Sequence, residues 1–371
     1  MTDPDTLVIG ATGRIGRRLV PELTRQGRHV AVLIRRAGEP TGYHPSREAE
    51  YREYVDGSGG DAERLTVLDG DLTLPGLGLP AGLDTVRDVY NLGALSGFDA
   101  DREEAYRVNV GGALAAVRWT AGLPRARRLV HVGDLRVPPV DGHLGVAGTD
   151  LPGRGLDPYE ADKIAADRAV REEACALGVP YNAVNPATVI SDDFQGFGIG
   201  DRFRGSDLDG LVHALNSGWL RALPGDRDTR IPLVCAGHLA RFLAAVPEHA
   251  APGEAFWVLD DATPPLHDLL RLIAGHLGVR APRWHVPAGL LHRLPRRFAE
   301  FPRIPPEVPG LLSSGRHPTG SARRLEAAAG LRMPDFDHAL RSWIDRLMPP
   351  GRPPLPGPVS CLCGLHQELK T

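Results

Sequence analysis

The apolar positions of the first half of the chain form short β-rich runs separated by stretches of helical length. Runs rich in valine, leucine and isoleucine predict strands at 6–10, 29–36, 64–72, 85–94, 127–135 and 179–190. Helices are predicted between them, at 11–27, 102–121 and 158–177. Strands that alternate with helices in this way are typical of α/β proteins with a doubly wound parallel sheet. We therefore expect that fold class.

After residue 190 the pattern changes to a smaller, mainly helical part. A glycine-rich aromatic stretch at 192–207 comes first, and helical patterns follow at 208–220, 236–246, 266–278 and 335–347. The aromatic stretch predicts a substrate loop with Phe194 and Phe197 at the pocket, although the same rings could anchor the loop to the core. We expect an α/β domain at 1–190, a substrate-binding part at 191–347 with segments that return to the sheet, and a proline-rich tail at 348–371.

Composition narrows the class of protein. The chain has 371 residues, of which 42% are hydrophobic and 24% charged, as in globular proteins that bury a core. With 43 basic and 46 acidic residues and no basic block, we expect neither a nucleic-acid partner nor a membrane surface. No apolar run approaches the ~20 residues of a membrane helix. The acidic N-terminus is unlike a signal peptide, and four cysteines are too few for a disulfide framework, so a cytoplasmic protein is expected. Histidines at ligand spacing are missing, and no metal site is predicted.

The segment GATGRIG follows the first predicted strand and opens a helix. Glycines at such a turn let backbone N–H groups approach a pyrophosphate at the positive end of the helix. The same spacing also occurs in plain strand–turn–helix connections. The residues expected around a dinucleotide at this turn are Gly10, Thr12, Gly13, Arg14, Ile15 and Gly16.

The end of the second predicted strand indicates which dinucleotide binds. A carboxylate at this place accepts a hydrogen bond from the ribose 2′-OH of NAD, but the chain has Arg35 and Arg36 there. A guanidinium can bind a 2′-phosphate in a bidentate manner. The sequence therefore predicts NADP(H) rather than NAD(H), unless the two arginines are only solvated.

Tyr159 and Lys163 lie four residues apart in the predicted helix 158–177, which places them on one face. A tyrosine hydroxyl has an ordinary pKa of ~10, and a neighbouring ammonium brings it closer to working pH. Lysine is found only at 163 and 370 in a chain whose other basic residues are arginine. The sequence therefore predicts an acid–base pair in which Tyr159 exchanges the proton and Lys163 tunes it and holds a ribose hydroxyl.

With these motifs, residues 6–250 resemble the extended short-chain dehydrogenase/reductase family, which includes NAD(P)-dependent epimerases and dehydratases. The segment GDLTLPGLGL and the insertion at 40–60 resemble its thioester-reductase and fatty acyl reductase branch. The resemblance implies an NADPH-driven reduction of a small-molecule substrate that can be carrier-bound. It also implies that Asn109 orders its helix and a water leading to Lys163, and that Ser96 contacts substrate. Further cofactor-binding residues implied by the family motifs are Asp71, Leu72, Asn91, Gly93, Ala94, Asn185, Pro186 and Ala187.

One position departs from the family. Where the family has serine or threonine after the fifth strand, this chain has Asp134, and an ionised carboxylate has no proton to donate to a substrate oxygen. Asp134 could be protonated in a dry pocket, or accept from a hydroxyl or pair with a cationic amine or iminium. Alternatively, the site has lost hydride chemistry, or the strand end is shifted and Asp134 faces solvent. The charge of Asp134 therefore makes reduction of a C=N bond, or oxidation of an amine, a stronger expectation for this chain than for the average family member.

The sequence thus predicts an NADP(H)-dependent oxidoreductase that reduces a carbonyl, acyl thioester or imine, with Tyr159, Lys163, Asp134 and Asn109 at the reacting centre. The alternatives are an epimerase, dehydratase or lyase with tightly held NADP, or a non-catalytic NADP-binding sensor. The resemblance also implies a homodimer through helices 102–121 and 158–177, whose small apolar residues allow such an interface. Those residues are Ala113, Ala116, Val117, Ile164, Ala165 and Ala169.

Overall fold

The computed structural model describes residues 3–34, 45–95, 102–138, 158–191, 207–220, 222–286, 312–313 and 317–349. Several residues with predicted roles lie outside these ranges, namely Arg35, Arg36, Ser96, Phe194, Phe197 and the end of the tail at 350–371. The backbone of Tyr159 is described, but its side chain is not.

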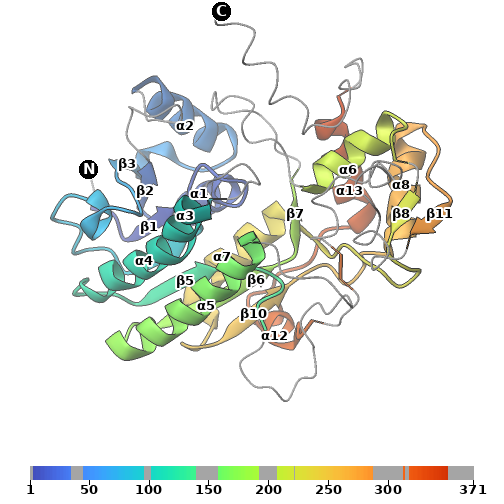
Figure 1. Ribbon diagram of the computed structural model, residues 1–371. Coiled ribbons are helices and arrows are strands. Elements are labelled where there is room, and N and C mark those ends of the chain that lie inside the picture. Colours follow the sequence, from blue (N-terminus) through green and yellow to red (C-terminus); the bar gives the residue numbers. More distant parts are fainter. Residues whose placement is uncertain are drawn as a thin grey trace, which may run out of the picture.

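A seven-stranded sheet forms the centre of the protein, with the strand order β10-β6-β5-β4-β1-β2-β3 (Figure 1). Every neighbouring pair runs parallel, so the predicted doubly wound α/β class is confirmed. The strands are β1 (Thr6–Ile9), β2 (Val30–Ile34), β3 (Leu65–Asp69), β4 (Asp88–Asn91), β5 (Arg128–Val132), β6 (Tyr181–Pro186) and β10 (Ala255–Val258).

The predicted strand at 179–190 is two strands, so its prediction as a single element was wrong. β6 ends at Pro186, and β7 (Thr188–Ile190) pairs in parallel with β9 (Leu233–Cys235) in a separate small sheet. Proline lacks the N–H group that a continuing ladder needs, and the chain changes sheets directly after it. The break directs the chain from the large sheet toward the C-terminal part.

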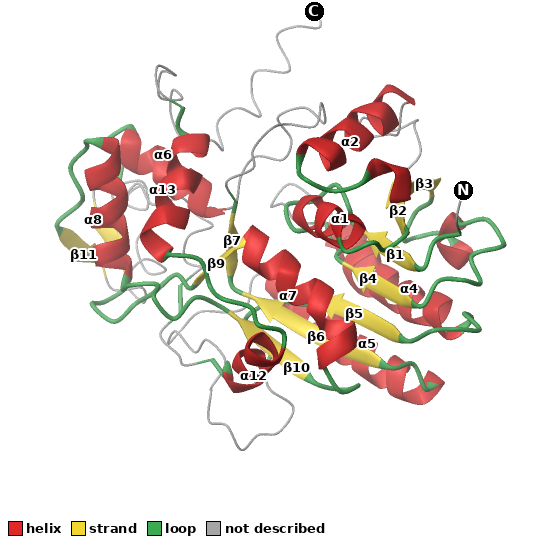
Figure 2. Cartoon of the chain, turned by 180° about the vertical axis from the view of Figure 1, so that it is seen from behind, coloured by secondary structure: helices red, strands yellow, loops and turns green. Residues whose placement is uncertain are grey.

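Helices cover both faces of the large sheet, as Figure 2 shows. On one face, side chains of the sheet pack against α1 (Gly16–Arg25), α2 (Pro45–Gly57), α7 (Ala236–His249) and α12 (Gly320–Ala328). The other face packs against α4 (Gly112–Ala121) and α5 (Pro158–Leu177). Strand residues alternate between the two cores: Val8 belongs to the first, and Leu7 and Ile9 to the second. None of the helices within the described ranges is long and apolar enough to cross a membrane.

The predicted helix at 102–121 contains a local irregularity. It is α3 (Arg102–Tyr106), then a π-helical turn η3 (Arg107–Gly111), then α4. A π turn inserts one extra residue per turn and is often found at functional positions. Here it carries Asn109, which is 3% exposed.

A second core lies in the C-terminal part, centred on the fully buried Trp343. It is formed by α6 (Asp207–Asn216), α8 (Leu266–Leu277) and α13 (Phe336–Leu347) with the strand pair β8 (Ala222–Pro224) and β11 (Trp284–Val286). Short 3-10 turns occur at Ala62–Arg64 and Pro75–Gly78. Although they follow residue 190, α7, β10 and α12 belong to the α/β layers.

The residues proposed for a dimer interface on the first helix are not on the surface. Ala113, Ala116 and Val117 are at most 2% exposed and pack inside the protomer's own core against the sheet. Ala165 and Ala169 are partly buried against the same core. The choice of the three α4 residues was therefore wrong, because their apolar character is explained by packing within one chain, whereas the choice of the α5 residues stays a prediction. Dimerisation itself stays a prediction.

An ion-pair network ties the strands together at the amino ends of the sheet. The fully buried carboxylate of Asp88 in β4 binds Arg28, and it binds Arg127 through two bonds of 2.9 and 2.6 Å. Arg127 also reaches Glu248 on α7 at 2.6 Å, where the carboxylate side chain is 55% exposed. Asp88 is therefore the buried centre of the network, and Glu248 is its solvated edge.

We expect Asp88→Asn to lower the free energy of unfolding by about 3–5 kcal/mol, because it leaves two guanidinium groups facing a neutral amide in a buried place. Glu248→Gln is the matched control, and we expect it to cost less than about 1 kcal/mol because solvent already screens that pair. Urea denaturation of the three proteins measures both values. Equal costs for the two variants would contradict this assignment.

Candidate functional site

The candidate site lies where the carboxyl ends of β1, β4, β5 and β6 meet. The segment after β4 stays beside β1, because the Leu92 amide donates to the Ile9 carbonyl at 2.9 Å. The segment after β5 stays beside β6 in the same way, with the Gly133 amide donating to the Val184 carbonyl at 2.9 Å. Ligands of open parallel sheets bind outside this edge.

Close packing explains two glycines of the turn after β1. Gly10 has φ +82°, and a Cβ at this position would lie 2.8 Å from the carbonyl carbon of Leu92. A Cβ on Gly16 would lie 2.4 Å from the Gly10 oxygen. Glycine is therefore required at both positions. The turn leads directly into α1, whose start has no side-chain cap, and the positive end of this helix therefore faces the turn.

Helix α2 holds the turn from outside. The fully buried Tyr51 donates its hydroxyl to the Ala11 carbonyl at 3.0 Å, and Tyr54 donates to the Arg17 carbonyl at 3.3 Å. The two rings stack with centroids 6.2 Å apart. Arg17 in turn donates to the Thr12 carbonyl at 2.9 Å. The insertion at 40–60 thus supplies a clamp that sequence reasoning missed, although its tyrosines were a visible signal.

Arg14 connects the turn to the C-terminal part. Its guanidinium donates to the Val189 carbonyl in β7 and to the carboxylate of Asp209 in α6, both at 2.9 Å. The Asp209 side chain is 3% exposed. The guanidinium therefore points toward the C-terminal part, while the Arg14 backbone remains in the turn.

The next predicted residues lie around the end of β4. Leu72 packs closely against two glycines, since a Cβ on Gly93 or Gly112 would come within 2.9 Å of it. The carboxylate of Asp71 accepts two bonds of 2.7 Å from the amide and hydroxyl of Thr73. The carboxylate of Asp71 is therefore fixed by its own turn, and the Leu72 side chain fills the space next to the end of β4.

Two asparagines, Asn109 and Asn91, fix the backbone at this edge of the sheet. Asn109 binds both backbone groups of Leu95, accepting from the amide at 2.8 Å and donating to the carbonyl at 3.1 Å. Asn91 accepts from the Gly93 amide at 3.2 Å, and its other end lies 3.3 Å from Nδ1 of His131. The π turn and the last residue of β4 thus fix the segment 92–95, which contains the predicted Gly93 and Ala94.

Lys163 is enclosed at the end of β5. The residue is 6% exposed, and its Nζ donates to the Val132 carbonyl at 3.4 Å. Burial lowers the pKa of Lys163, and the nearby carboxylate of Asp134 acts in the opposite direction. α5 begins at Pro158, so Tyr159 stands in its first turn, four residues before Lys163. The helix and the strand thus bring Lys163 and Asp134 together.

Asp134 sits among cationic groups. Its Oδ1 accepts from the Arg136 amide at 3.0 Å and lies 3.7 Å from the Arg136 guanidinium. Its side chain is 20% exposed. Together with Lys163, these contacts suit an ionised carboxylate that is compensated by positive charge. They reduce the repulsion that such a charge would exert on a substrate oxygen.

His131 is a buried member of the site that sequence reasoning treated as an ordinary histidine. Burial, with the charge of Lys163 in addition, lowers the pKa of His131 to about 3. The imidazole is therefore neutral across the physiological range. Its Nε2 has no hydrogen-bond partner among the described residues.

Asn185 is the strongest sign of a missing ligand. It is fully buried near the end of β6, and neither its amide oxygen nor its amide nitrogen has a partner among the described residues. A Cβ on Gly133 would lie 2.2 Å from its oxygen, so the glycine makes room for the amide. Buried side-chain amides normally have hydrogen-bond partners. A polar ligand such as a nicotinamide nucleotide could supply them, so the residues at this place fit such a ligand. The neighbouring Pro186 and Ala187 complete the strand end, and the Ala187 amide donates to the Val258 carbonyl at 2.9 Å.

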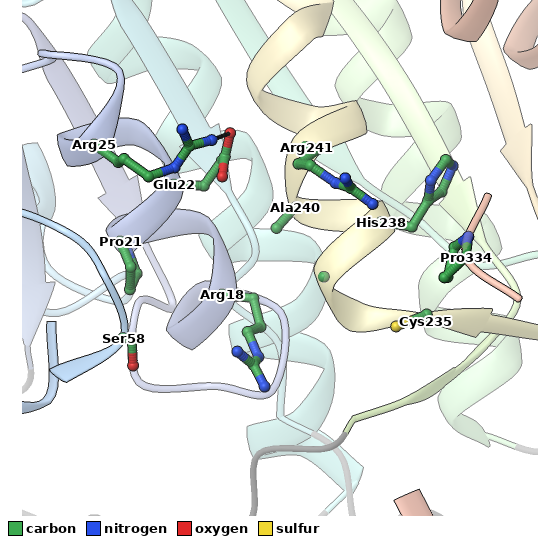
Figure 3. Close-up of a pocket in the computed structure, with 11 residues that line it drawn as sticks. Arg18, Pro21, Glu22, Arg25, Ser58, Cys235, His238, Ala240, Arg241 and Pro334 are labelled. Atoms are coloured by element: carbon green, nitrogen blue, oxygen red, sulfur yellow. Dashed lines mark hydrogen bonds and ion pairs between the residues drawn. The ribbon is translucent and has the colours of Figure 1, made fainter. Parts of the chain in front are cut away.

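A groove between α1 and α7 is a separate feature (Figure 3). Arg18, Arg25, Cys235, His238 and Arg241 are among its lining residues, and Arg25 binds Glu22 at 2.6 Å. None of the lining residues is a predicted site residue. Across the described ranges, no cluster of three or more His, Cys, Asp or Glu side chains could hold a metal ion.

Comparison with known proteins identifies relatives of the chain. The profile of an NAD-binding family, described as male sterility protein, matches residues 8–243. The chain is 29% identical over 193 residues to trichosetin synthetase PKS-NRPS1 of Gibberella fujikuroi, a match that covers 50% of this chain and 4% of the synthetase. It is 26% identical over 305 residues to a 3β-hydroxysteroid dehydrogenase/Δ5→4-isomerase of Mycobacterium tuberculosis, covering 76% of this chain and 71% of that protein.

Among solved structures, the terminal R domain of the myxalamid PKS-NRPS pathway has the same fold. It superimposes with a TM-score of 0.67 at 17% identity, covering 94% of this chain and 91% of the domain. At this identity the likeness shows the fold alone. The chain is therefore similar in sequence to a PKS-NRPS synthetase and to a 3β-hydroxysteroid dehydrogenase/Δ5→4-isomerase, and in fold to a terminal R domain of a PKS-NRPS pathway.

We expect the neutral buried His131 to make the protein less stable in acid. The unfolded chain binds a proton near pH 6.5 and the folded chain only near pH 3, so folded-state stability falls as pH drops through this window. The loss between pH 6.5 and 5 is about 2 kcal/mol. His131→Gln should flatten this dependence in urea denaturation, whereas His249→Gln, at an exposed position on α7, should leave it unchanged. An equal slope in wild type and His131→Gln would contradict the assignment.

Proposed function

The chain belongs to the NAD-binding family described as male sterility protein, within the extended short-chain dehydrogenases/reductases, and from that premise we propose that it is an NADPH-dependent reductase of acyl thioesters. The observation that carries this proposal is the enclosed Lys163, four residues after Tyr159 and beside Asp134. This is the arrangement an acid–base pair needs next to a hydride donor.

The cofactor would lie across the strand ends. The turn 10–16 would hold the pyrophosphate, and Asp71 and Leu72 would flank the adenine, with Arg35 and Arg36 directly after β2 at the 2′-phosphate. When bound, NADPH supplies the hydride. Further residues that would contact it are Asn91, Gly93, Ala94, Asn185, Pro186 and Ala187.

The protein's own groups would handle the proton and the charge. Tyr159 would donate its phenolic proton to the substrate oxygen, because the Lys163 ammonium favours the resulting phenolate. Lys163 would also hold the nicotinamide ribose, a task for which a compact ammonium suits the enclosed space better than a guanidinium. Asn109 would keep the segment around Leu95 in position beneath the cofactor.

An acyl thioester on a carrier is the substrate class that the relatives favour. The Gibberella fujikuroi relative is a PKS-NRPS synthetase, and the structural neighbour is a terminal R domain of such a pathway. Hydride would add to the thioester carbon, the carbon–sulfur bond would then break, and the proton that Tyr159 gave to the oxygen would pass to the leaving sulfur, so that the products would be an aldehyde, a free thiol and NADP⁺. Ser96, Phe194 and Phe197 would contact the acyl part, from segments next to the strand ends in sequence.

We expect purified protein to consume NADPH and release one thiol per NADPH when given an acyl phosphopantetheine thioester. Tyr159→Phe should lower kcat by about 100-fold or more without loss of NADPH binding, because it removes only the proton donor. Tyr106→Phe, at a tyrosine that is 53% exposed, is the matched control and should behave as wild type. The fall in NADPH absorbance measures cofactor consumption, and a thiol reagent measures the thiol that is released.

The double variant Arg35→Ala/Arg36→Ala in the same assay should raise the KM for NADPH and leave that for NADH unchanged. Thiol release without NADPH consumption, or full activity of Tyr159→Phe, would refute the proposed function.

A further inference from the structure

Arg14 joins the glycine turn to the C-terminal part through two bonds of one side chain. Its Nη1 donates to the Val189 carbonyl in β7 and its Nη2 donates to the Asp209 carboxylate in α6, both at 2.9 Å. These partners lie 175 and 195 residues further along the chain. A guanidinium is a planar fork with a fixed spacing between its donors. The side chain therefore sets the positions of both partners together.

The two partners of Arg14 belong to one packed unit. β7 follows the large sheet directly, and its last residue, Ile190, is 2% exposed in the C-terminal core. The same core contains Leu208 and Leu211 of α6, which lie on either side of Asp209 in the sequence and are fully buried. Apolar packing therefore holds β7 and α6 together, and Arg14 attaches this unit to the turn.

Burial makes the ion pair between Arg14 and Asp209 important for the position of α6. The Asp209 side chain is 3% exposed and the Arg14 side chain is 26% exposed. A buried carboxylate is strongly destabilised when a charged partner is removed. The pair therefore favours the position of α6 in which Asp209 reaches the guanidinium.

The other end of Arg14 lies in the turn that would receive the pyrophosphate. The Gly13 amide donates to the Gly10 carbonyl at 3.1 Å, and the Arg17 amide donates to the Gly13 carbonyl at 3.0 Å. Phosphate oxygens bound by the amides of this turn would restrict its movement further. Because the guanidinium is held by β7 and α6, the side chain would pass this restriction on to them.

We infer that Arg14 couples cofactor binding to the order of the C-terminal part, so that NADPH at the turn holds β7 and α6 more firmly. The inference rests on the proposed function, because it needs a dinucleotide at the turn 10–16. Coupling of this kind is reciprocal, so a substrate held by the C-terminal part would raise the affinity for NADPH by the same factor. Arg14 and Asp209 are then positioning residues, which bring the substrate-binding part into place when the cofactor is bound.

Hydrogen–deuterium exchange of the amides of α6 measures this coupling without turnover. Saturating NADP⁺, with binding confirmed by calorimetry for each protein, should slow exchange at 207–216 by at least about fivefold in wild type. Arg14→Met removes the donors and Asp209→Asn removes the charge. In both variants bound NADP⁺ should leave the exchange rate of α6 unchanged.

Arg25→Met is the matched control for these variants. Arg25 is an exposed arginine of the same helix α1 and pairs with Glu22 within that helix, so its loss should preserve the full effect of NADP⁺ on α6. A merely structural role of the ion pair would speed exchange with and without NADP⁺ and keep their ratio. Circular dichroism verifies folding, and Arg14→Met decides alone should Asp209→Asn not fold.

Three results would overturn the coupling. The first is an α6 exchange rate that bound NADP⁺ does not change in wild type, and the second is an equal slowing in wild type and Arg14→Met. The third is a folded Arg14→Met that no longer binds NADP⁺, because the guanidinium would then act on the cofactor itself. A wild-type chain that binds no NADP⁺ in calorimetry would instead refute the proposed function, and the coupling would fall with it.

Discussion

An ammonium ion enclosed between a helix and the end of a strand is the constraint on which this structure depends. Lys163 is buried at the end of β5, where removal from water disfavours its charge. The Val132 carbonyl and the Asp134 carboxylate compensate for that loss. His131, the other ionisable neighbour from the same strand, stays neutral and adds no competing charge. The proposed chemistry depends on the positive charge at this place, which burial disfavours and the Asp134 carboxylate favours.

The same edge of the sheet joins distant parts of the chain. Arg14 links the glycine turn to α6. α7, β10 and α12 return to the α/β layers, although they follow residue 190.

Local patterns allowed the sequence to predict much of this arrangement. Continuous apolar runs predicted the parallel sheet, and helix α5 has the same bounds as its prediction, 158–177. Gly10 and Gly16 were recognisable because their spacing reflects a packing requirement that acts within a few residues. The position of Lys163 on helix α5 also followed from the predicted helix at 158–177.

Features that depend on contacts between distant segments could not be predicted in this way. β10 has four residues and is defined by its pairing with β6, which no local pattern reveals. The small residues of α4 suggested an interface, but the sheet of the same chain covers them. The role of α2 as a clamp likewise arises only when the chain has folded. The aspartate at position 134, where the family has serine or threonine, can therefore be interpreted only from the residues that surround it in the folded chain.

A crystal structure of the protein with bound NADP⁺ is the most direct test of the central claim. The account predicts that Nζ of Lys163 lies within hydrogen-bond distance of a hydroxyl of the nicotinamide ribose, with the nicotinamide ring between the ends of β5 and β6. A nucleotide bound elsewhere, such as in the groove between α1 and α7, or a ribose out of reach of Lys163, would contradict it.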